Sequence, residues 1–97
     1  MSSGFLAQQM RIAAKKAGIM AAVEAKSQNN ILEDIPNASL LLVGPHLAYA
    51  YEELKEKCDP YHVPVLIIPK EMYAGLDGTG LLNLSIETIK GKEQDHE

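Results

Sequence analysis

The sequence predicts an α/β fold, a three-layer sandwich in which a parallel sheet lies between helices. Helix-like and strand-like segments alternate along the 97 residues, as they do in parallel α/β proteins. The run Leu40-Leu41-Leu42-Val43 is apolar on both faces, which is typical of a strand covered by helices above and below. A chain of this length forms one domain, expected over residues 1–90. Residues 91–97 lack an apolar anchor and are expected to form a flexible tail.

Composition argues against several classes of function. The net charge is −4, and no basic stripe offsets it, so nucleic acid and anionic membranes are not expected as main partners. The sequence contains neither a secretory signal nor an apolar run of about 18 residues. Its single cysteine, Cys58, excludes an internal disulfide, so a cytoplasmic protein is expected. The histidines and Cys58 have no metal-binding spacing, and neither a metal nor a cofactor is expected.

The first half of the chain predicts three elements. A helix from Phe5 to Ala17 follows from apolar residues at four-three-four spacing, and Gly18 supplies its stop. Alternation of side chains over Ile19 to Ala25 predicts a strand, although its alanines are weak strand formers. Asn30, with Glu33 three residues later, predicts a capped short helix that ends at Pro36.

The second half predicts a continuation of the same alternation. After the strand Leu40 to Val43, Gly44-Pro45 turns the chain into a helix from His46 to Cys58. The β-branched run Val63 to Ile68 lies between prolines and predicts a strand. A turn-rich loop, Lys70 to Gly80, then leads to a last helix with Leu82, Ile86 and Ile89 on its apolar face.

The first four residues, Met1-Ser2-Ser3-Gly4, form the strongest candidate binding feature. A loop of small residues that leads into a helix presents unpaired N–H groups and the positive end of the helix dipole, which suits phosphate. Such loops normally follow a parallel strand. The sequence therefore predicts half of an anion site, with Met1, Ser2, Ser3 and Gly4 as its phosphate-binding residues.

Three segments together resemble the IIB subunit of the lactose/cellobiose class of the bacterial sugar phosphotransferase system (PTS). They are Met1-Ser2-Ser3, similar to the end of a Cys-Ser-Ala-Gly-Met-Ser-Thr-Ser loop; Leu41 to His46 after the central strand; and Tyr73 with Asp77-Gly78 before the last helix. The resemblance covers roughly residues 1 to 90. It implies the flavodoxin-like, phosphatase-loop type of α/β sandwich.

The resemblance also implies a phosphotransferase that acts through a phosphocysteine. In the family, the loop cysteine takes a phosphoryl group from a histidine of the IIA subunit and passes it to a sugar held by the membrane subunit IIC. Relative to that pattern, this sequence lacks the first strand and the loop cysteine. The expectation is an N-terminally truncated, catalytically incompetent form, whose unpaired strand edges would favour a homo-oligomer. The sugar remains open among cellobiose, chitobiose, lactose and other β-glucosides.

Several residues have two interpretations. Cys58 lies on an apolar helix stripe, which favours a structural role over replacement of the missing nucleophile. His46 stands where the family usually has glutamine, and it is either a phosphate contact or a helix-starting surface residue. Tyr73 is either a phosphate or docking contact or core filler. Asp77 and Gly78 favour a turn and helix entry over a catalytic carboxylate. With Gly44 and Pro45, these residues make up the expected loop edge and partner-docking surface.

Two functions of other classes stay open. One is a non-catalytic interaction module that binds a IIA or IIC partner without accepting phosphate. The other is a small-anion-binding domain of the same fold with no connection to sugar, because a fold alone does not fix a function.

Overall fold

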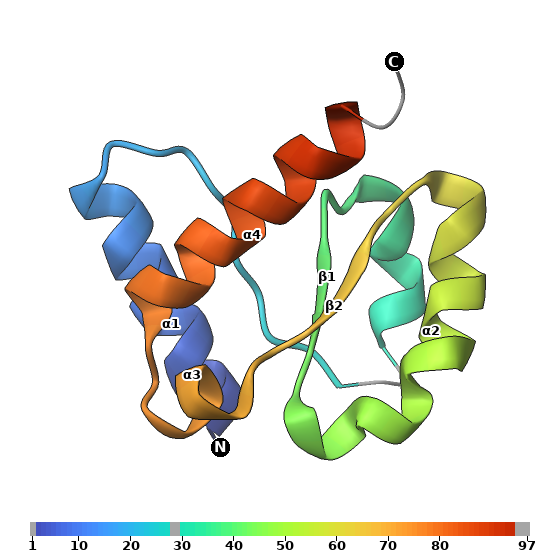
Figure 1. Cartoon of the computed structure of the whole chain (residues 1–97), viewed down its shortest axis with the longest axis horizontal. Helices are drawn as coiled ribbons and strands as arrows, with labels where there is room; N and C mark the ends of the chain where they lie inside the picture. The colour runs from blue at the N-terminus through green and yellow to red at the C-terminus, as the bar shows by residue number, and fades with distance from the viewer. Residues whose placement is uncertain (1, 28–29, 95–97) are drawn as a thin grey trace.

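The fold is that of a computed structural model, which describes residues 2–27 and 30–94. It has three layers, with a small parallel sheet between two groups of helices (Figure 1). One layer holds α1 and α4, and the opposite layer holds α2 with short 3-10 turns. The elements run in the order α1 (Ser2–Lys16), η1 (Ile31–Glu33), η2 (Ile35–Asn37), β1 (Leu41–Val43), η3 (Pro45–Ala50), α2 (Tyr51–Cys58), η4 (Asp59–Tyr61), β2 (Val65–Ile67), α3 (Lys70–Ala74) and α4 (Gly78–Gln94). The predicted α/β sandwich is confirmed.

The sheet in the described part of the chain consists of β1 and β2. They pair in parallel, with Leu42 opposite Leu66. The ladder is continued at both ends, because the Leu41 N–H donates to the Pro64 carbonyl at 3.0 Å and the Ile68 N–H to the Val43 carbonyl at 2.8 Å. Since neighbouring residues of a strand direct their backbone groups to opposite sides, the N–H and C=O of Leu42 face away from β2.

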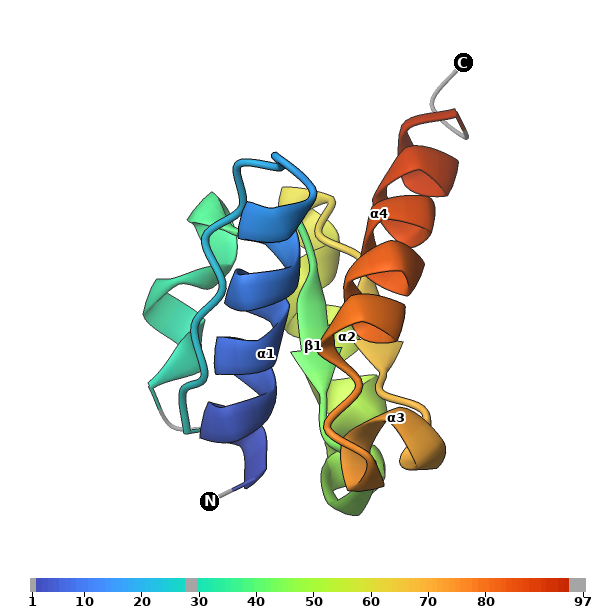
Figure 2. The ribbon, with the colours of Figure 1, turned by 90° about the vertical axis from the view of Figure 1, so that its left-hand side faces the viewer.

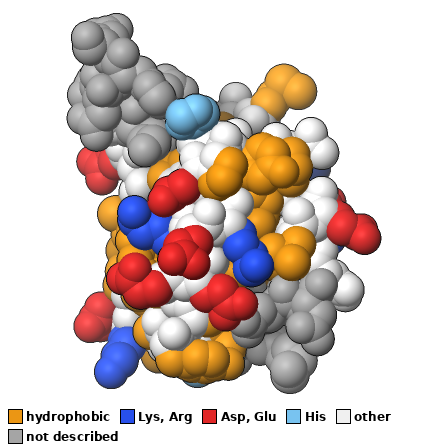
Figure 3. Space-filling view, turned by 90° about the vertical axis from the view of Figure 1, so that its right-hand side faces the viewer, with side chains coloured by type: hydrophobic (Ala, Val, Ile, Leu, Met, Phe, Trp, Pro, Cys, Tyr) orange, Lys and Arg blue, Asp and Glu red, His pale blue; other side chains and the backbone are white. Residues whose placement is uncertain are grey.

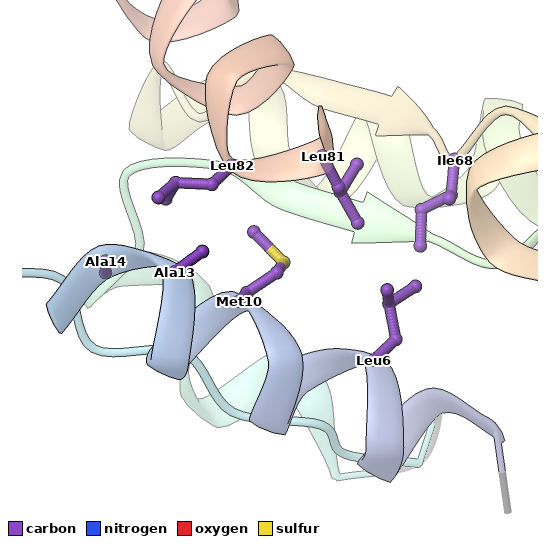
Figure 4. Close-up of a cluster of buried hydrophobic side chains, with 7 residues drawn as sticks. All are labelled: Leu6, Met10, Ala13, Ala14, Ile68, Leu81 and Leu82. Carbon is purple, nitrogen blue, oxygen red and sulfur yellow. The ribbon is translucent and has the colours of Figure 1, made fainter. Parts of the chain in front are cut away.

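One apolar core lies between α1 and α4 and reaches the end of β2 (Figure 4). In Figure 4, side chains from the two helices point toward each other, and that of Ile68 closes one end of the cluster. Its buried members are Leu6, Met10, Ala13, Ala14, Ile68, Leu81 and Leu82. Leu6, Met10 and Ala13 are the inward stripe that the sequence spacing predicts, so this helix face is confirmed.

A second core lies on the other face of the sheet, where α2 packs against the strands. Its buried members are Ile35, Leu41, Val43, Ala50, Leu54, Cys58 and Val63. Ala50, Leu54 and Cys58 are spaced four residues apart, which places them on one side of the helical segment. β1 contributes Leu41 and Val43 to this core, while Leu42 packs against the other one. β1 is therefore apolar on both faces because each face packs against a different core.

The predicted strand Ile19 to Ala25 is wrong. The segment forms no regular secondary structure, and Met20 is fully exposed. Its alternating pattern is built largely from alanine, which has little β propensity, and no neighbouring strand compensates for this within the described residues. Side chains hold the segment instead: the Arg11 Nε–H donates to the Val23 carbonyl at 2.7 Å, and Lys26 pairs with Asp34 at 2.8 Å.

Several boundaries also differ from those expected. Asn30 makes no side-chain capping bond, so the predicted capping pair is wrong. The helix expected from His46 to Cys58 is interrupted, because Leu47 has non-helical angles of φ −109° and ψ 16°. The loop expected from Lys70 to Gly80 contains α3 and the start of α4. At its other end α4 continues past residue 90 to Gln94. No helix in the described ranges is long and apolar enough to cross a membrane.

Candidate functional site

The candidate site lies at the carboxyl ends of the two strands. Gly44-Pro45-His46 directly follows β1, and α3 follows β2 after Ile68-Pro69. Both Figure 1 and Figure 2 show the start of α1 at this same end of the molecule. Ligands of open parallel sheets bind outside this edge, because loops from neighbouring strands converge there. The fold therefore places three of the segments that the sequence singled out at the same end of the molecule.

Gly44, His46 and Tyr73 form a contact cluster at this edge. The rings of His46 and Tyr73 are 5.6 Å apart between centroids and inclined at 53°. A Cβ atom on Gly44 would lie 3.0 Å from Nδ1 of His46 and 3.6 Å from Cε1 of Tyr73. Only glycine leaves room for this arrangement. Gly44 is extended (φ −60°, ψ 149°), and its carbonyl accepts a hydrogen bond from the Leu47 N–H at 2.9 Å.

His46 is exposed, whereas Tyr73 is half-buried and packs against the core between α1 and α4. Pro45 occupies a first-turn position of η3, where its fixed φ suits a helix start. Tyr73 owes its position to α3, which the sequence interpretation missed. The available signal was Pro69, which takes the N-cap position, followed by the helix-forming residues Lys70-Glu71-Met72.

Asp77 and Gly78 have structural roles at the start of α4. The Asp77 carboxylate accepts a hydrogen bond from the Gly80 N–H at 2.9 Å. Asp77 is thus the N-cap of α4, and its side chain satisfies the N–H group three residues further on. Gly78 is buried against α1, where a Cβ would lie 2.6 Å from both Cβ and the carbonyl oxygen of Gln9. The predicted turn and helix entry are present.

The first four residues are arranged differently from the loop expected there. Met1 lies outside the described residues, and Ser2, Ser3 and Gly4 are already part of α1. The helix therefore begins before Phe5, and the first N–H groups of α1 belong to these small residues. Gly4 is exposed, and a Cβ there would meet no atom within 4 Å. The segment lies at the expected end of the fold, but as helix rather than loop.

Cys58 lies away from the candidate site. It is the last residue of α2, and its carbonyl accepts a hydrogen bond from the Val63 N–H at 3.3 Å, just before β2 begins. This is the amino end of the strand, opposite the candidate site. The Cys58 side chain has no exposed surface. Burial, assisted by the Asp59 carboxylate, raises the pKa of the Cys58 thiol. A buried, protonated thiol is a poor nucleophile, so Cys58 is a core residue.

A shallow cavity of about 180 Å³ lies between α2 and the start of β2. Its lining residues are Tyr51, Lys55, Asp59, His62, Val63, Pro64 and Val65. Like Cys58, it is at the amino end of β2 and so is separate from the candidate site. The molecular face in Figure 3 shows basic side chains interspersed with acidic ones and no continuous basic area.

Comparison with known proteins agrees with the geometry. The sequence profile of the family described as "PTS system, Lactose/Cellobiose specific IIB subunit" matches residues 1–84. A similar curated protein is the "PTS system oligo-beta-mannoside-specific EIIB component" of Bacillus subtilis (strain 168). The two sequences are 31% identical over 78 residues, which cover 80% of this chain and 76% of the relative. The chain thus belongs to the family of lactose/cellobiose-specific IIB subunits of the sugar phosphotransferase system.

Proposed function

We propose that the chain serves as the phosphocarrier IIB component of a cellobiose/lactose-type sugar phosphotransferase system, working in the cytoplasm. In this role it receives a phosphoryl group from a IIA subunit and delivers it toward a sugar held by IIC. The observation that supports the proposal is that the start of α1, the Gly44–His46 turn and α3 all lie at the end of the molecule where the strands finish. The family of the chain supports the same function.

The substrate class is a β-linked di- or oligosaccharide. Support comes from the family description, which names lactose and cellobiose, and from the relative's name, which specifies an oligo-β-mannoside. No sugar contact is assigned to this chain, because in this proposal the sugar is recognised by the membrane component.

Phosphate would be bound by the segment Met1 to Gly4, in which Ser2, Ser3 and Gly4 supply N–H groups at the start of α1. Exposed charges at a helix N-terminus gain about 0.3 to 1 kcal/mol each, whereas a Kd of about 1 mM requires about 4 kcal/mol, so free phosphate is expected to bind with millimolar affinity at most. Titration of the ¹⁵N-labelled chain with inorganic phosphate should shift the amides of Ser3 to Leu6 first. Shifts confined to other parts of the chain would argue against this half of the site.

The docking surface for IIA would include Gly44, Pro45, His46 and Tyr73, with Asp77 and Gly78 fixing the start of α4 behind it. Unphosphorylated IIA, added to the labelled chain, should perturb the amides of His46 and Tyr73 and leave those of Glu53 and Lys57 on α2 unchanged. A response centred on α2 would reject this surface. If IIA binds but transfers no phosphoryl group, even to a chain extended by a cysteine-containing loop, the result would instead support the non-catalytic interaction module.

Phosphoryl transfer to sulfur is not expected for residues 1–97, since their single cysteine is the buried Cys58. The test is incubation with phosphorylated IIA, followed by mass spectrometry. A second protein is tested in parallel: the same chain extended at its N-terminus by a strand and a Cys-Ser-Ala-Gly loop. This extended protein should gain phosphate on the added thiol. An adduct on Cys58, or an extended protein that gains nothing, would overturn the proposal.

A further inference from the structure

The cavity at the amino end of β2 lies away from the proposed docking surface and has a volume of about 180 Å³. Figure 1 shows the end of α2 and the start of β2, which form this cavity, at the opposite end of the molecule from the start of α1. A water molecule takes up about 30 Å³ of liquid volume, so the cavity has room for roughly six water-sized groups. It therefore fits a small molecule, of the size of a short-chain organic acid.

Polar side chains spaced four residues apart line one wall of the cavity. Tyr51 and Lys55 belong to α2, and Asp59 directly follows this helix. The Lys55 ammonium lies 3.9 Å from the Asp59 carboxylate, which is too long for a hydrogen bond, and both side chains are half exposed or more. The ammonium therefore keeps N–H donors for a second acceptor, and Tyr51 adds a hydroxyl to the same wall.

The base of the cavity is apolar and includes an outward backbone N–H. Its residues are Val63, Pro64 and Val65. Val65 stands opposite Leu41, whose N–H donates to the Pro64 carbonyl, so the N–H of Val65 faces away from β1. In the two-stranded sheet of the described residues, this N–H has no ladder partner. A cation and a neutral donor above an apolar base suit a carboxylate with a short hydrocarbon body.

His62 closes the wall between Asp59 and the base of the cavity. Its backbone is left-handed (φ 59°, ψ 31°), and its N–H donates to the Asp59 carbonyl at 3.0 Å. This conformation is uncommon for a residue other than glycine, and it costs free energy that glycine would avoid. The chain nevertheless places an imidazole at the cavity here, which indicates a role for this side chain beyond forming the turn.

We propose that this cavity is a binding site for a small organic monocarboxylate. The ligand carboxylate accepts hydrogen bonds from Lys55 and from the Val65 N–H, and its hydrocarbon part lies against Val63 and Pro64. Asp59 repels a second negative charge on the ligand, so a monocarboxylate binds better than a dicarboxylate of similar size. The inference does not rest on the proposed function, because the cavity and the docking surface lie at opposite ends of the sheet.

The test is titration of the ¹⁵N-labelled 97-residue chain with sodium butyrate at constant ionic strength. We expect saturable shifts of the amides of His62, Val63 and Val65, with a dissociation constant in the millimolar range. Butylammonium and 1-butanol have the same hydrocarbon body without a negative charge and should cause no saturable shift at these amides. Succinate should bind more weakly than butyrate. Equal binding of butyrate and 1-butanol, or butyrate shifts confined to Ser3 to Leu6, would overturn the proposal.

Two pairs of variants separate a specific site from the overall charge of the chain. Lys55→Gln should weaken butyrate binding roughly twofold to fivefold, as expected for loss of one half-exposed charge contact. Lys57→Gln removes an equal charge from an exposed residue of α2 that does not line the cavity, and it should leave the affinity unchanged. Asp59→Asn should strengthen binding, whereas Glu56→Gln, the same change of charge at another exposed position of α2, should not. Circular dichroism would establish that all four variants are folded. Equal effects within either pair would mean that butyrate responds only to net charge, and the site would be rejected.

Discussion

Gly78 marks the closest approach of α1 and α4. A Cβ there would lie 2.6 Å from two atoms of Gln9, one of them a backbone oxygen that cannot rotate away. Gly78→Ala should therefore push the two helices apart and lower the free energy of unfolding by about 1–3 kcal/mol, the usual cost of overpacking. Urea denaturation followed by circular dichroism measures this change.

Gly91 provides the matched control for that substitution. It also lies in α4, but a Cβ there would meet no atom within 4 Å. Gly91→Ala should raise stability by about 0.5–1 kcal/mol, because alanine loses less backbone entropy in a helix. Equal effects of the two substitutions would show that Gly78 is not a packing contact.

Cys58 makes stability depend on pH in the alkaline range. Its pKa in the folded chain is raised above the ordinary thiol value, while the unfolded chain keeps that value. Above the unfolded pKa, the unfolded state loses the thiol proton and the folded state keeps it, so the free energy of unfolding falls as pH rises. The protonated Cys58 thiol stabilises the folded chain fully below the pKa that this thiol has in the unfolded chain. This stabilisation is lost as the pH rises toward the pKa of the thiol in the folded chain. The slope from this group is at most about 1.4 kcal/mol per pH unit.

The measurement compares pH profiles rather than single stabilities. Urea denaturation between neutral pH and pH 10 should show a steeper decline for the natural chain than for Cys58→Ala, which lacks the thiol. Other titrating groups contribute equally to both profiles. Parallel profiles would mean that the thiol ionises as readily in the folded chain as in the unfolded one.

Residue roles that depend on local pattern were accessible from sequence, and those that depend on long-range contacts were not. The burial of Cys58 follows from its place on an apolar helix stripe, and the turn at Asp77 follows from the chemistry of aspartate and glycine. The contact of His46 with Tyr73 joins residues from two separate elements, η3 and α3. No spacing in the sequence encodes that distance.

At the scale of elements, residues 19–27 depend on side chains for their position. Arg11 bonds to the Val23 carbonyl, and Lys26 lies 2.8 Å from Asp34 and 3.4 Å from Glu24. Those carboxylates, Asp34 first, raise the pKa of Lys26. Exposed pairs of this kind contribute little to stability, but they restrain a segment without regular structure.

Arg11→Ala should therefore loosen this segment without unfolding the chain. Limited thermolysin digestion would be expected to cleave between Ile19 and Val23 faster in the variant, while the urea midpoint changes little. Lys15→Ala removes another exposed basic side chain of α1 and serves as the control. Equal cleavage rates in both variants would show that the Arg11 bond does not hold the segment.

The same segment shows where element prediction from sequence failed. Alternating side chains over Ile19 to Ala25 are necessary for a half-buried strand, but a strand also needs a partner, and the described sheet ends at β1. α3 was missed for a related reason: its five residues are too few for helical periodicity to show. By contrast, α1 and α4 are long enough to display their apolar stripes, and both were predicted.

At the scale of the whole molecule, the described residues fold compactly around a sheet with two free edges. The radius of gyration is 12.8 Å, close to the roughly 12.5 Å expected for a compact domain of this length. The two edges differ. β2 is bracketed by Pro64 and Pro69, which discourage further pairing, whereas the outward N–H and C=O of Leu42 on β1 have no such protection.

We therefore expect the 97-residue chain to self-associate through the open edge of β1. The segment Ile19 to Ala25 does not pair with this edge, and an apolar strand with free backbone groups recruits another chain. Light scattering over a concentration series should show species heavier than the 10.6 kDa monomer. Leu40→Lys places a charge beside the edge of β1 and should shift the distribution toward monomer. The control Tyr49→Lys makes the same change of charge at an exposed site in η3 and should leave the distribution unchanged. A monomer at all concentrations, with cooperative unfolding, would mean that the α1 and α4 core stabilises a two-stranded sheet without help from a second copy.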